Sequence, residues 1–305
     1  MVPNITLKQL AHLSALERER HFGRAAEACH VSQSALSASL QTLEGQLGAA
    51  LVDRTKRQVV LTPLGEETVA RARRILEAVE DLAAMAAAEQ APLSGTLRLG
   101  VIPTIGPFLL PRALPRLRQR YPKLKLYLVE DLTDRLVEGL HRGRLDALLV
   151  ALPWDCGNVD AAHVLDDRFL LACPKGHRLA AAEAAEPGEI QADSLLLLRE
   201  GHCLSDHALS ACRIEARRHQ EAFEATSLPT LMQMVDNSLG ITILPQSAVD
   251  AGILRGTRVI TRNIAGPVPS REIALVWRKG TARAGEFRLL AEELARLCDP
   301  ARESG

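Results

Sequence analysis

The chain has 305 residues and 37 basic against 37 acidic side chains, so its formal net charge at pH 7 is zero. That length predicts two or three domains that each bury a core, and 47% hydrophobic with 24% charged residues argues against global disorder. The balanced charge removes the simplest argument for a nucleic-acid partner, so any DNA-binding surface must concentrate positive charge locally. The opening residues lack the pattern of a secretion signal, and no apolar run approaches the ~18 residues of a membrane span. We therefore expect a cytoplasmic protein with no membrane partner.

The amino-terminal segment carries the periodicity of three short helices. Residues 6–19 place apolar side chains at helical spacing after Thr6, which can cap the first turn, and residues 22–29 predict a short second helix. Ser32 then offers a new N-cap for a third helix. The third helix is amphipathic, and its predicted buried stripe consists of Leu36, Leu40, Leu43 and Leu47.

Short uncharged polar side chains lie at the front of the third helix, at Gln33, Ser34 and Ser37. Glutamine can pair with the edge of adenine and serine with any base, so a short helix, a turn and this amphipathic helix suit reading of the major groove. The alternative is an ordinary three-helix bundle with a solvated polar face. The next segment favours DNA binding, because two short apolar strands enclose a cation cluster that includes Arg54 and Lys56. Such a wing would meet the phosphate backbone.

Residues 22–55, FGRAAEACHVSQSALSASLQTLEGQLGAALVDRT, resemble the winged helix-turn-helix of the LysR-type transcriptional regulators. In that family the third helix enters the major groove of double-stranded DNA. The resemblance therefore implies two sets of DNA contacts. Base contacts are expected from Gln33, Ser34 and Ser37, and backbone contacts from Arg54 and Lys56.

A long helix is expected over residues 63–91, with Thr62 as its N-cap and Pro63 as its first residue. Its apolar positions follow the spacing of a coiled-coil seam, at Ala72, Ile75, Val79, Leu82 and Ala86. The pattern predicts a dimer, and a lone surface helix is the alternative. A dimer presents two reading heads, so we expect a two-fold related DNA site with half-sites one or more helical turns apart, roughly 34 Å each.

The pattern changes after residue 91, where proline, serine and glycine interrupt the helix. We therefore expect three domains: a winged helix-turn-helix over residues 1–62, a linker and dimerisation helix over 63–91, and an effector domain over 92–305. Helical stretches in the effector domain alternate with apolar segments, which predicts an α/β fold with a largely parallel sheet. The expected strands are residues 96–102, 123–130, 146–151, 195–198, 240–245 and 272–277.

This region resembles the effector domain of the same family, which is similar to periplasmic binding proteins. The resemblance implies two α/β lobes with a ligand between them, one formed by residues 95–167 with 269–305 and the other by the residues between. Thr104 and Thr133 follow the first two expected strands, where ligand-binding groups belong in such sheets. Taken alone, either threonine is more often a helix cap than a ligand contact.

Cys203 and Cys212 lie nine positions apart in EGHCLSDHALSAC, residues 200–212, a run that favours helix or turn. In one straight helix their α-carbons would be ~13 Å apart and their thiols would lie on opposite faces. A disulfide tolerates at most about 7 Å, so the bond could form only if the segment unwinds. Such a segment would have two conformations, which is what a switch requires. The pattern does not rank the two thiols by reactivity.

The segment GHCLSDHALSAC, with GVIPTIGPFLLP before it and ATSLPTLMQMV after it, resembles the hydrogen peroxide-sensing branch of the LysR family. The resemblance implies that peroxide oxidises Cys203 to a sulfenic acid and that Cys212 resolves it as a disulfide. It also implies a peroxide pocket in which a guanidinium holds the thiolate and hydroxyls align the O–O bond. The expected members of this pocket are Thr104, Thr133, His202, Asp206 and Arg271.

The remaining cysteines are expected to be structural: Cys29, Cys156, Cys173 and Cys298. Since neither a C-x-x-C nor an H-x-x-x-H spacing occurs, we expect no metal and no cofactor.

A peroxide-responsive regulator is the favoured function, and two alternatives stay open. One is a LysR-type regulator that responds to a small metabolite between the lobes, with the cysteines incidental. The other is a thiol peroxidase, an enzyme that would not need residues 1–90. The helix-turn-helix and the missing secretion signal exclude an extracytoplasmic solute-binding protein. The residues themselves indicate a homodimer, and family likeness suggests a homotetramer built as a dimer of dimers. RNA polymerase and a thiol reductant are expected as further partners.

Overall fold

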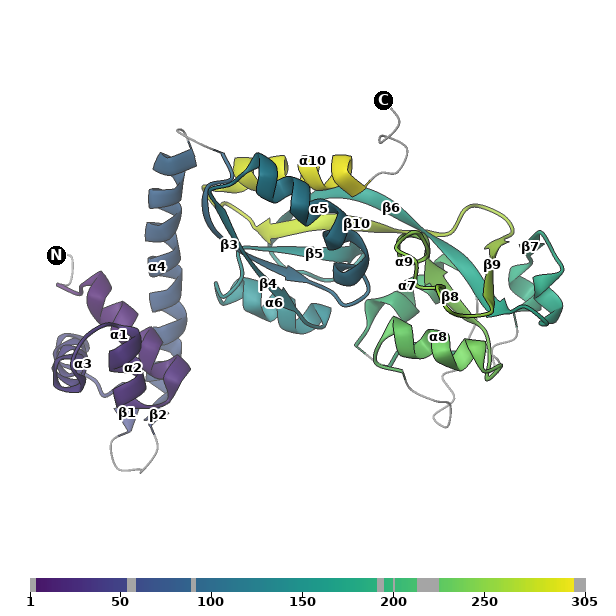
Figure 1. Cartoon of the computed structure of the whole chain (residues 1–305). Helices are drawn as coiled ribbons and strands as arrows, with labels where there is room; N and C mark the ends of the chain where they lie inside the picture. The colour runs from purple at the N-terminus through teal and green to yellow at the C-terminus, as the bar shows by residue number, and fades with distance from the viewer. Residues whose placement is uncertain are drawn as a thin grey trace. The chain divides into compact units, whose positions relative to one another are not determined.

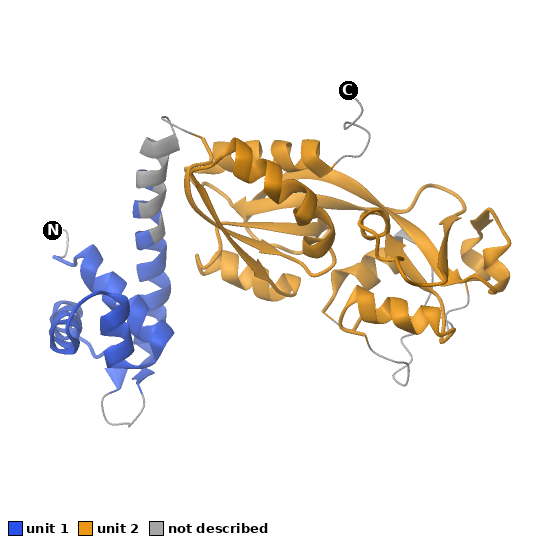
Figure 2. Cartoon of the chain, viewed as in Figure 1, with its two compact units in different colours: residues 1–89 blue, residues 90–305 orange. Residues whose placement is uncertain are grey.

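The computed structural model describes residues 4–53, 59–88, 92–190, 195–199, 201–212 and 225–298 (Figure 1). Within these ranges the side chains of residues 77, 80, 81, 83–88, 211 and 212 are not described. The chain divides into two compact units, residues 1–89 and 90–305, coloured blue and orange in Figure 2. Among the described helices, none is long and apolar enough to cross a lipid bilayer.

The first unit begins with the three expected helices, α1 (Leu7–Glu19), α2 (Phe22–Ala28) and α3 (Gln33–Leu47). The two predicted caps are confirmed: Thr6 Oγ1 accepts a hydrogen bond from the Gln9 N–H, and Ser32 Oγ accepts one from the Ala35 N–H. Leu36, Leu40 and Leu43 are buried as predicted, and they pack against apolar residues of α1 and α2.

Leu47, the fourth member of the predicted stripe, is 40% exposed, so that part of the prediction is wrong. The physical reason is that α3 ends at this residue. Gly48 follows with a φ of +69°, a conformation that glycine adopts without strain, and the chain turns away before anything covers Leu47.

A short antiparallel hairpin of β1 (Val52–Asp53) and β2 (Val60–Leu61) lies where the wing was predicted, before α4 (Pro63–Ala88). Thr62 Oγ1 accepts a hydrogen bond of 3.0 Å from the Gly65 N–H and caps α4. Gly65 permits a close approach, since a Cβ there would lie 2.1 Å from the Leu51 carbonyl oxygen. An ion pair between Arg73 and Glu17 ties α4 to α1.

Among the described residues of the second unit, eight strands form one sheet in the order β4-β3-β5-β10-β6-β9-β7, with β8 paired to β6. The strands are β3 (Gly95–Val101), β4 (Leu124–Glu130), β5 (Ala147–Leu152), β6 (Val159–Pro174), β7 (Ala184–Ala185), β8 (Thr242–Pro245), β9 (Val259–Ile264) and β10 (Ser270–Arg278). β10 runs antiparallel to β5 and β6, and β6 runs antiparallel to β8 and β9. The prediction of a largely parallel sheet is therefore wrong, because the chain returns from its second half as a strand that enters the middle of the sheet.

The helices are α5 (Gly106–Arg120), α6 (Thr133–His141), α7 (Cys203–Cys212), α8 (Leu228–Asp236), α9 (Gln246–Asp250) and α10 (Ala284–Cys298), with short 3-10 turns at Arg178–Ala180 and Pro187–Glu189. Figure 1 shows α5 and α10 over one face of the sheet and α6 over the other. Two hydrophobic cores result. One is built mainly from residues 93–164 and 273–298 and the other mainly from residues 169–264, in agreement with the two expected lobes.

Two local predictions in the second lobe need correction. Residues 195–198 do not form a strand, since Leu195 and Leu198 make only isolated bridges, to Ile241 and Ala225. The expected strands also leave out β7 and β9, and of β6 only the end near Cys173 was expected. β6 is the longest strand among the described residues, and it runs from one core into the other.

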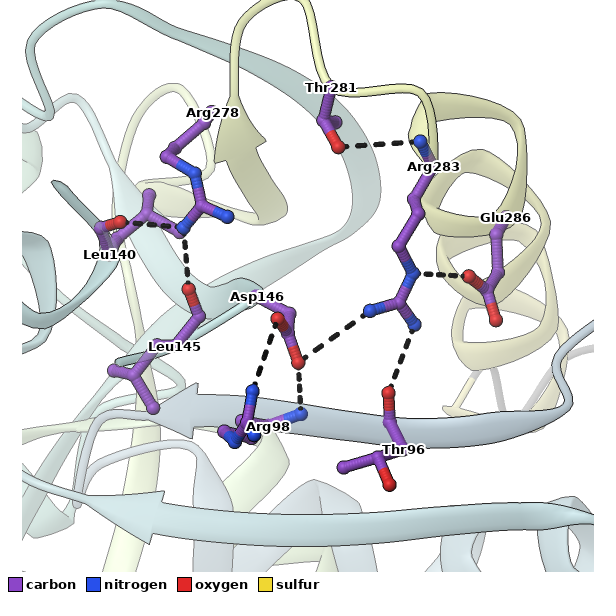
Figure 3. Close-up of polar contacts among 9 residues, drawn as sticks. All are labelled: Thr96, Arg98, Leu140, Leu145, Asp146, Arg278, Thr281, Arg283 and Glu286. Carbon is purple, nitrogen blue, oxygen red and sulfur yellow. Dashed lines mark hydrogen bonds and ion pairs between the residues drawn. The ribbon is translucent and has the colours of Figure 1, made fainter. Parts of the chain in front are cut away.

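A polar network fixes the end of the first lobe at which β3 begins (Figure 3). Asp146 accepts a hydrogen bond of 2.6 Å from the Arg98 N–H, and it pairs with the guanidinium groups of Arg98 at 4.0 Å and of Arg283 at 3.7 Å. Arg283 also donates to Glu286 Oε2 and to the Thr96 carbonyl oxygen. These contacts join the starts of β3, β5 and α10. They therefore fix β3 and β5 at the ends opposite to those that lead to Thr104 and Pro153.

Candidate functional site

Cys203 is the first residue of α7, and its side chain is only 2% exposed. Gly201 provides the turn that leads into this helix, with a φ of +93°. A Cβ at Gly201 would also lie 3.0 Å from Leu132 Cδ1, so a larger residue would be both strained and crowded. After this turn the Cys203 side chain lies in the core of the first lobe. The other buried apolar residues of α7 belong to the core of the second lobe.

The surroundings of Cys203 act on its ionisation in opposite directions. Burial is the largest effect and raises the pKa of the thiol above its usual range. The Arg271 guanidinium, the Thr133 hydroxyl and the backbone N–H at the start of α7 lower that pKa, and the Asp206 charge raises it. A cation, a hydroxyl and a helix N-terminus around one thiol are the groups that stabilise a thiolate when it forms.

Arg271 is fully buried, and Asp167 connects it to the second lobe. Its guanidinium donates to Thr104 Oγ1 and to the Thr104 carbonyl oxygen, both at 2.9 Å, and to Asp167 Oδ2 at 2.9 Å. Asp167 also accepts from the Ser247 N–H at 2.9 Å and from Ser247 Oγ at 2.8 Å. Arg271 and Asp167 are direct cross-strand neighbours on β10 and β6, which explains their pairing. The network holds the guanidinium in place before any ligand arrives.

Thr133 is the first residue of α6 and is 1% exposed. Its hydroxyl acts on the pKa of Cys203, yet Thr133 Oγ1 has no hydrogen-bond partner of good geometry among the described residues. A buried hydroxyl without a partner is costly unless something else binds it. Thr133 therefore has a free hydrogen-bonding position beside the Cys203 thiol for a small polar molecule.

Of the five expected pocket residues, the structure brings three into one buried cluster with Cys203: Thr104, Thr133 and Arg271. His202 is half-buried, and burial, followed by the charge of Arg199, lowers its pKa, so its imidazole is neutral at pH 7. Asp206 is exposed on the first turn of α7 and reaches Cys203 only through its charge. These two residues lie at the edge of the cluster.

Three residues near the thiol were not predicted. Asp167 stands in DDRFLLAC, where an acidic residue two positions before an apolar run was the available signal. His207, one turn after Cys203, is buried, and its Nε2 lies 2.8 Å from the Pro153 carbonyl oxygen. Cys156 is buried in the same core as Cys203. Burial raises the pKa of Cys156 to about 11, and the charges of Asp155 and of an ionised Cys203 raise it too, so the two thiols are neighbours.

Of the two conformations expected for this run, helix and turn, the structure shows the helix, because α7 contains both cysteines. At 1.5 Å per residue their α-carbons are ~13 Å apart, and nine residues turn through about 900°, which places the two positions on opposite faces. The side chain of Cys212 lies outside the described residues. A disulfide cannot bridge this backbone, since it needs α-carbons within about 7 Å. The helical form of α7 therefore keeps the two cysteines apart.

The raised pKa of Cys203 gives a pH dependence with a definite sign. Because burial keeps the thiol protonated at neutral pH and only the thiolate attacks, we expect the rate of Cys203 oxidation to rise by up to about tenfold per pH unit between about pH 6 and about pH 8. Rapid mixing with hydrogen peroxide and trapping of the sulfenic acid with dimedone measures this rate. A rate that is flat over this range would mean that Arg271 and Thr133 outweigh burial.

The expected DNA-reading residues lie at the front of α3. Gln33 and Ser34 are exposed, and Ser37 is half-buried. Ser34 Oγ lies 3.0 Å from Ser32 Oγ, so the cap residue orients this hydroxyl. Arg54 and Lys56, expected at the tip of the wing, lie outside the described residues.

Three residues of the expected coiled-coil seam on α4 are exposed to solvent. Ile75, Val79 and Leu82 are 47%, 39% and 62% exposed, at helical spacing on one side of the helix. Ala72 is buried in its own unit, so its assignment to the seam is wrong. It lies on the same side of α4 as Val79, seven residues earlier, but on a part of the helix that its own unit already covers. The side chain of Ala86 lies outside the described residues.

Comparison with known proteins agrees with this architecture. The model of the bacterial regulatory helix-turn-helix protein, lysR family, matches residues 7–66, and the model of the LysR substrate binding domain matches residues 90–299. Over 96% of this chain and 97% of its own length, the HTH-type transcriptional regulator EstR of Acinetobacter baylyi is 39% identical. A probable hydrogen peroxide-inducible genes activator of Streptomyces viridosporus is 43% identical over 95% of this chain and 93% of its own. A full-length OxyR variant from Pseudomonas aeruginosa superposes with a TM-score of 0.82 at 37% identity, covering 97% of this chain and 96% of that chain. The chain belongs to the LysR family of bacterial helix-turn-helix transcriptional regulators.

Proposed function

We propose that the protein is a cytoplasmic transcriptional regulator that senses hydrogen peroxide through Cys203. The observation that carries the proposal is the setting of this thiol. It is buried at a helix N-terminus, beside a guanidinium held in place by Asp167 and beside the Thr133 hydroxyl, for which the described part of the chain provides no hydrogen-bond partner. Relatives that cover the chain almost completely include a probable hydrogen peroxide-inducible genes activator. A small, polar, uncharged oxidant matches a buried site of this kind.

One molecule of hydrogen peroxide oxidises the two thiols to one disulfide. The Cys203 thiolate attacks one oxygen of hydrogen peroxide, the O–O bond breaks, and the products are a sulfenic acid and hydroxide. Arg271 stabilises the thiolate, and the hydroxyls of Thr104 and Thr133 are placed to align the O–O bond. The Cys212 thiol then attacks the sulfenic sulfur, the S–OH bond breaks, and water leaves as the disulfide forms. A thiol reductant reverses this oxidation.

The second step supplies the conformational signal. Because α7 holds the two cysteines apart, disulfide formation requires residues 203–212 to leave the helical form. α7 packs against β10 and contributes residues to both cores, so its rearrangement disturbs both lobes. In this proposal residues 92–305 sense peroxide, 63–91 dimerise and 1–62 bind double-stranded DNA. The reduced and the disulfide-bonded homodimer or homotetramer would then bind operator DNA in different geometries. RNA polymerase would respond to that difference.

Peptide mapping after oxidation tests the proposal. Equimolar hydrogen peroxide is expected to give a Cys203–Cys212 cross-linked peptide in the intact protein, with a change in its footprint on operator DNA. Cys203→Ser should lose both effects, and Cys212→Ser should stop at a dimedone-reactive sulfenic acid. Cys173→Ser is the matched control, since Cys173 is buried in the other lobe. Absence of the cross-linked peptide would overturn the proposal, and continuous peroxide consumption after deletion of residues 1–90 would favour a thiol peroxidase.

One observation favours a second candidate, a regulator that responds to a metabolite. A cavity of about 850 Å³ lies where α5, β6, α9 and α10 meet, and Asp167 and Ser247 are among its lining residues. A small molecule bound there would act on the same buried network as peroxide. Under this candidate, Cys203→Ser would leave the regulation of DNA binding intact.

A further inference from the structure

α7 lies between the two cores of the effector unit and presents a different pair of residues to each. Leu204 and Ala208 are buried in the core of the second lobe. Cys203 is buried in the core of the first, and His207, four residues later, lies on the same helix face. Detaching the first turns of α7 from the first lobe therefore means breaking the contacts of Cys203 and of His207.

His207 makes a polar contact between α7 and the first lobe. Its side chain is 8% exposed, and its Nε2 lies 2.8 Å from the Pro153 carbonyl oxygen. A carbonyl can only accept, so Nε2 carries the proton. The ring also meets Trp154 edge-on, with centroids 6.5 Å apart, and Trp154 Nε1 donates to Asp134 Oδ1 at 3.1 Å. His207 is thus linked to α6, the helix that begins at Thr133.

We propose that His207 is a positioning residue that clamps α7 onto the first lobe and sets how fast the Cys203 sulfenic acid proceeds to the disulfide. The inference rests on the proposed function and names a residue that acts on its second step. Reaction with peroxide needs Cys203 in the cluster with Arg271 and Thr133, which the clamp preserves. Attack by Cys212 needs α7 to open, which the clamp opposes.

The protonation state of His207 decides how strong the clamp is. Its Nδ1 is buried without a hydrogen-bond partner among the described residues, so a second ring proton would find no acceptor. Burial is the largest effect on the pKa of His207 and lowers it below 6.5, and the charge of Arg271 on β10 lowers it as well. The hydrogen bond to Pro153 and the charge of Asp206 on α7 act in the opposite direction and raise it. Asp134 on α6 reaches the ring only through Trp154. Because the docked form prefers the neutral ring, the clamp is fully present above pH 6.5 and weakens as the pH falls below it.

Two substitutions at this position separate the hydrogen bond from the titration. His207→Ala removes both, whereas His207→Gln keeps an N–H that can donate to Pro153 and cannot titrate. Ser210→Ala, at an exposed position of the same helix, is the matched control. The two steps are followed separately in the full-length protein after mixing with hydrogen peroxide: the sulfenic acid by dimedone trapping, and the Cys203–Cys212 disulfide by acid quench and peptide mapping.

At about pH 7.5, His207→Ala is expected to form the disulfide roughly 5 to 30 times faster than the wild type, the factor that corresponds to losing one hydrogen bond and one ring contact. The first step should change less than the second, and Ser210→Ala should change neither. His207→Gln should match the wild type at about pH 7.5, and the ratio of wild-type to His207→Gln rates should rise as the pH falls to about 5.5.

The failures are distinguishable. If the wild type forms no Cys203–Cys212 disulfide, the proposed function is wrong. If the wild type forms it but His207→Ala is no faster in the second step, the clamp is wrong and the sensor stands. If His207→Ala does not fold, His207→Gln still tests the clamp. A ratio of wild-type to His207→Gln rates of disulfide formation that stays constant from about pH 7.5 to about pH 5.5 would show that the clamp is wrong.

Discussion

Arg271→Met is expected to lower the rate of Cys203 oxidation by about 100-fold, in line with the removal of one preorganised charge-stabilising group from an active site. In the wild type the guanidinium opposes the effect of burial on the pKa of Cys203. Without it, burial acts nearly alone, the thiolate becomes rarer at neutral pH, and the pocket loses its cation. Trapping with dimedone after mixing with peroxide measures the loss, which should shrink as the pH is raised.

The same substitution is expected to destabilise the protein by about 3–5 kcal/mol, because it leaves a buried carboxylate without its countercharge. Asp167 is 2% exposed, and Arg271 donates to it at 2.9 and 3.2 Å. Chemical unfolding of the reduced protein measures this loss.

Combining Arg271→Met with Asp167→Asn separates reactivity from folding. The asparagine side-chain oxygen can still accept from the Ser247 N–H, and no charge remains buried, so stability should largely return. Reactivity with peroxide should not return, since the cation is still missing. Recovery of the oxidation rate in the double variant would show that Arg271 acts only through the fold.

The first unit could be predicted closely because its signals are local. Thr6, Ser32 and Thr62 are side-chain caps within three residues of the N–H groups that they bind, and α3 shows its buried stripe at regular spacing. The exceptions, Leu47 and Ala72, depend on what lies around the helix. Neither the turn after α3 nor the packing of α4 on α1 can be read from the periodicity of one helix.

The sheet of the second unit was harder to predict because its strands are defined by distant partners. β6 is interrupted by the polar run DDR, residues 166–168, so it shows neither strict alternation nor a continuous apolar run. It becomes a strand by pairing with β10 at one end and with β8 and β9 at the other, about 70 to 120 residues away. The antiparallel direction of β10 follows from the return of the chain to the first lobe and has no local signature.

The same distinction applies to the site. Thr104 and Thr133 follow strands that were predicted, and the residues around Cys203 were inferred from family resemblance. Asp167 and His207 were missed because their roles depend on partners far away in sequence, Arg271 and Pro153. A lone aspartate and a lone histidine carry no signal of such partners. Family resemblance likewise gave Asp206 a place in the pocket, whereas the structure leaves its side chain exposed.

Val79→Glu is expected to separate the chain into monomers and to weaken operator binding by about 100- to 10,000-fold, the range that separates bivalent from single-site binding. Val79 lies between Ile75 and Leu82 on the exposed apolar side of α4, and burial of a glutamate in a helix pair would be strongly unfavourable. Analytical ultracentrifugation gives the oligomeric state, and gel-shift titration at fixed salt gives the affinity.

Ala70→Glu is the matched control for this prediction. Ala70 is exposed on α4, nine residues before Val79, and nine residues turn the helix through about 900°, so it lies on the opposite side. It adds the same charge to the same helix and should leave the dimer intact and operator affinity near that of the wild type. DNA with a single half-site separates the loss of dimerisation from a loss of DNA contacts. Val79→Glu should bind this DNA as the wild type does, because α3 is unchanged. The loss of affinity should appear only on DNA that contains the full two-fold site. If Val79→Glu remains a dimer, the exposed side of α4 is not the seam that pairs the reading heads.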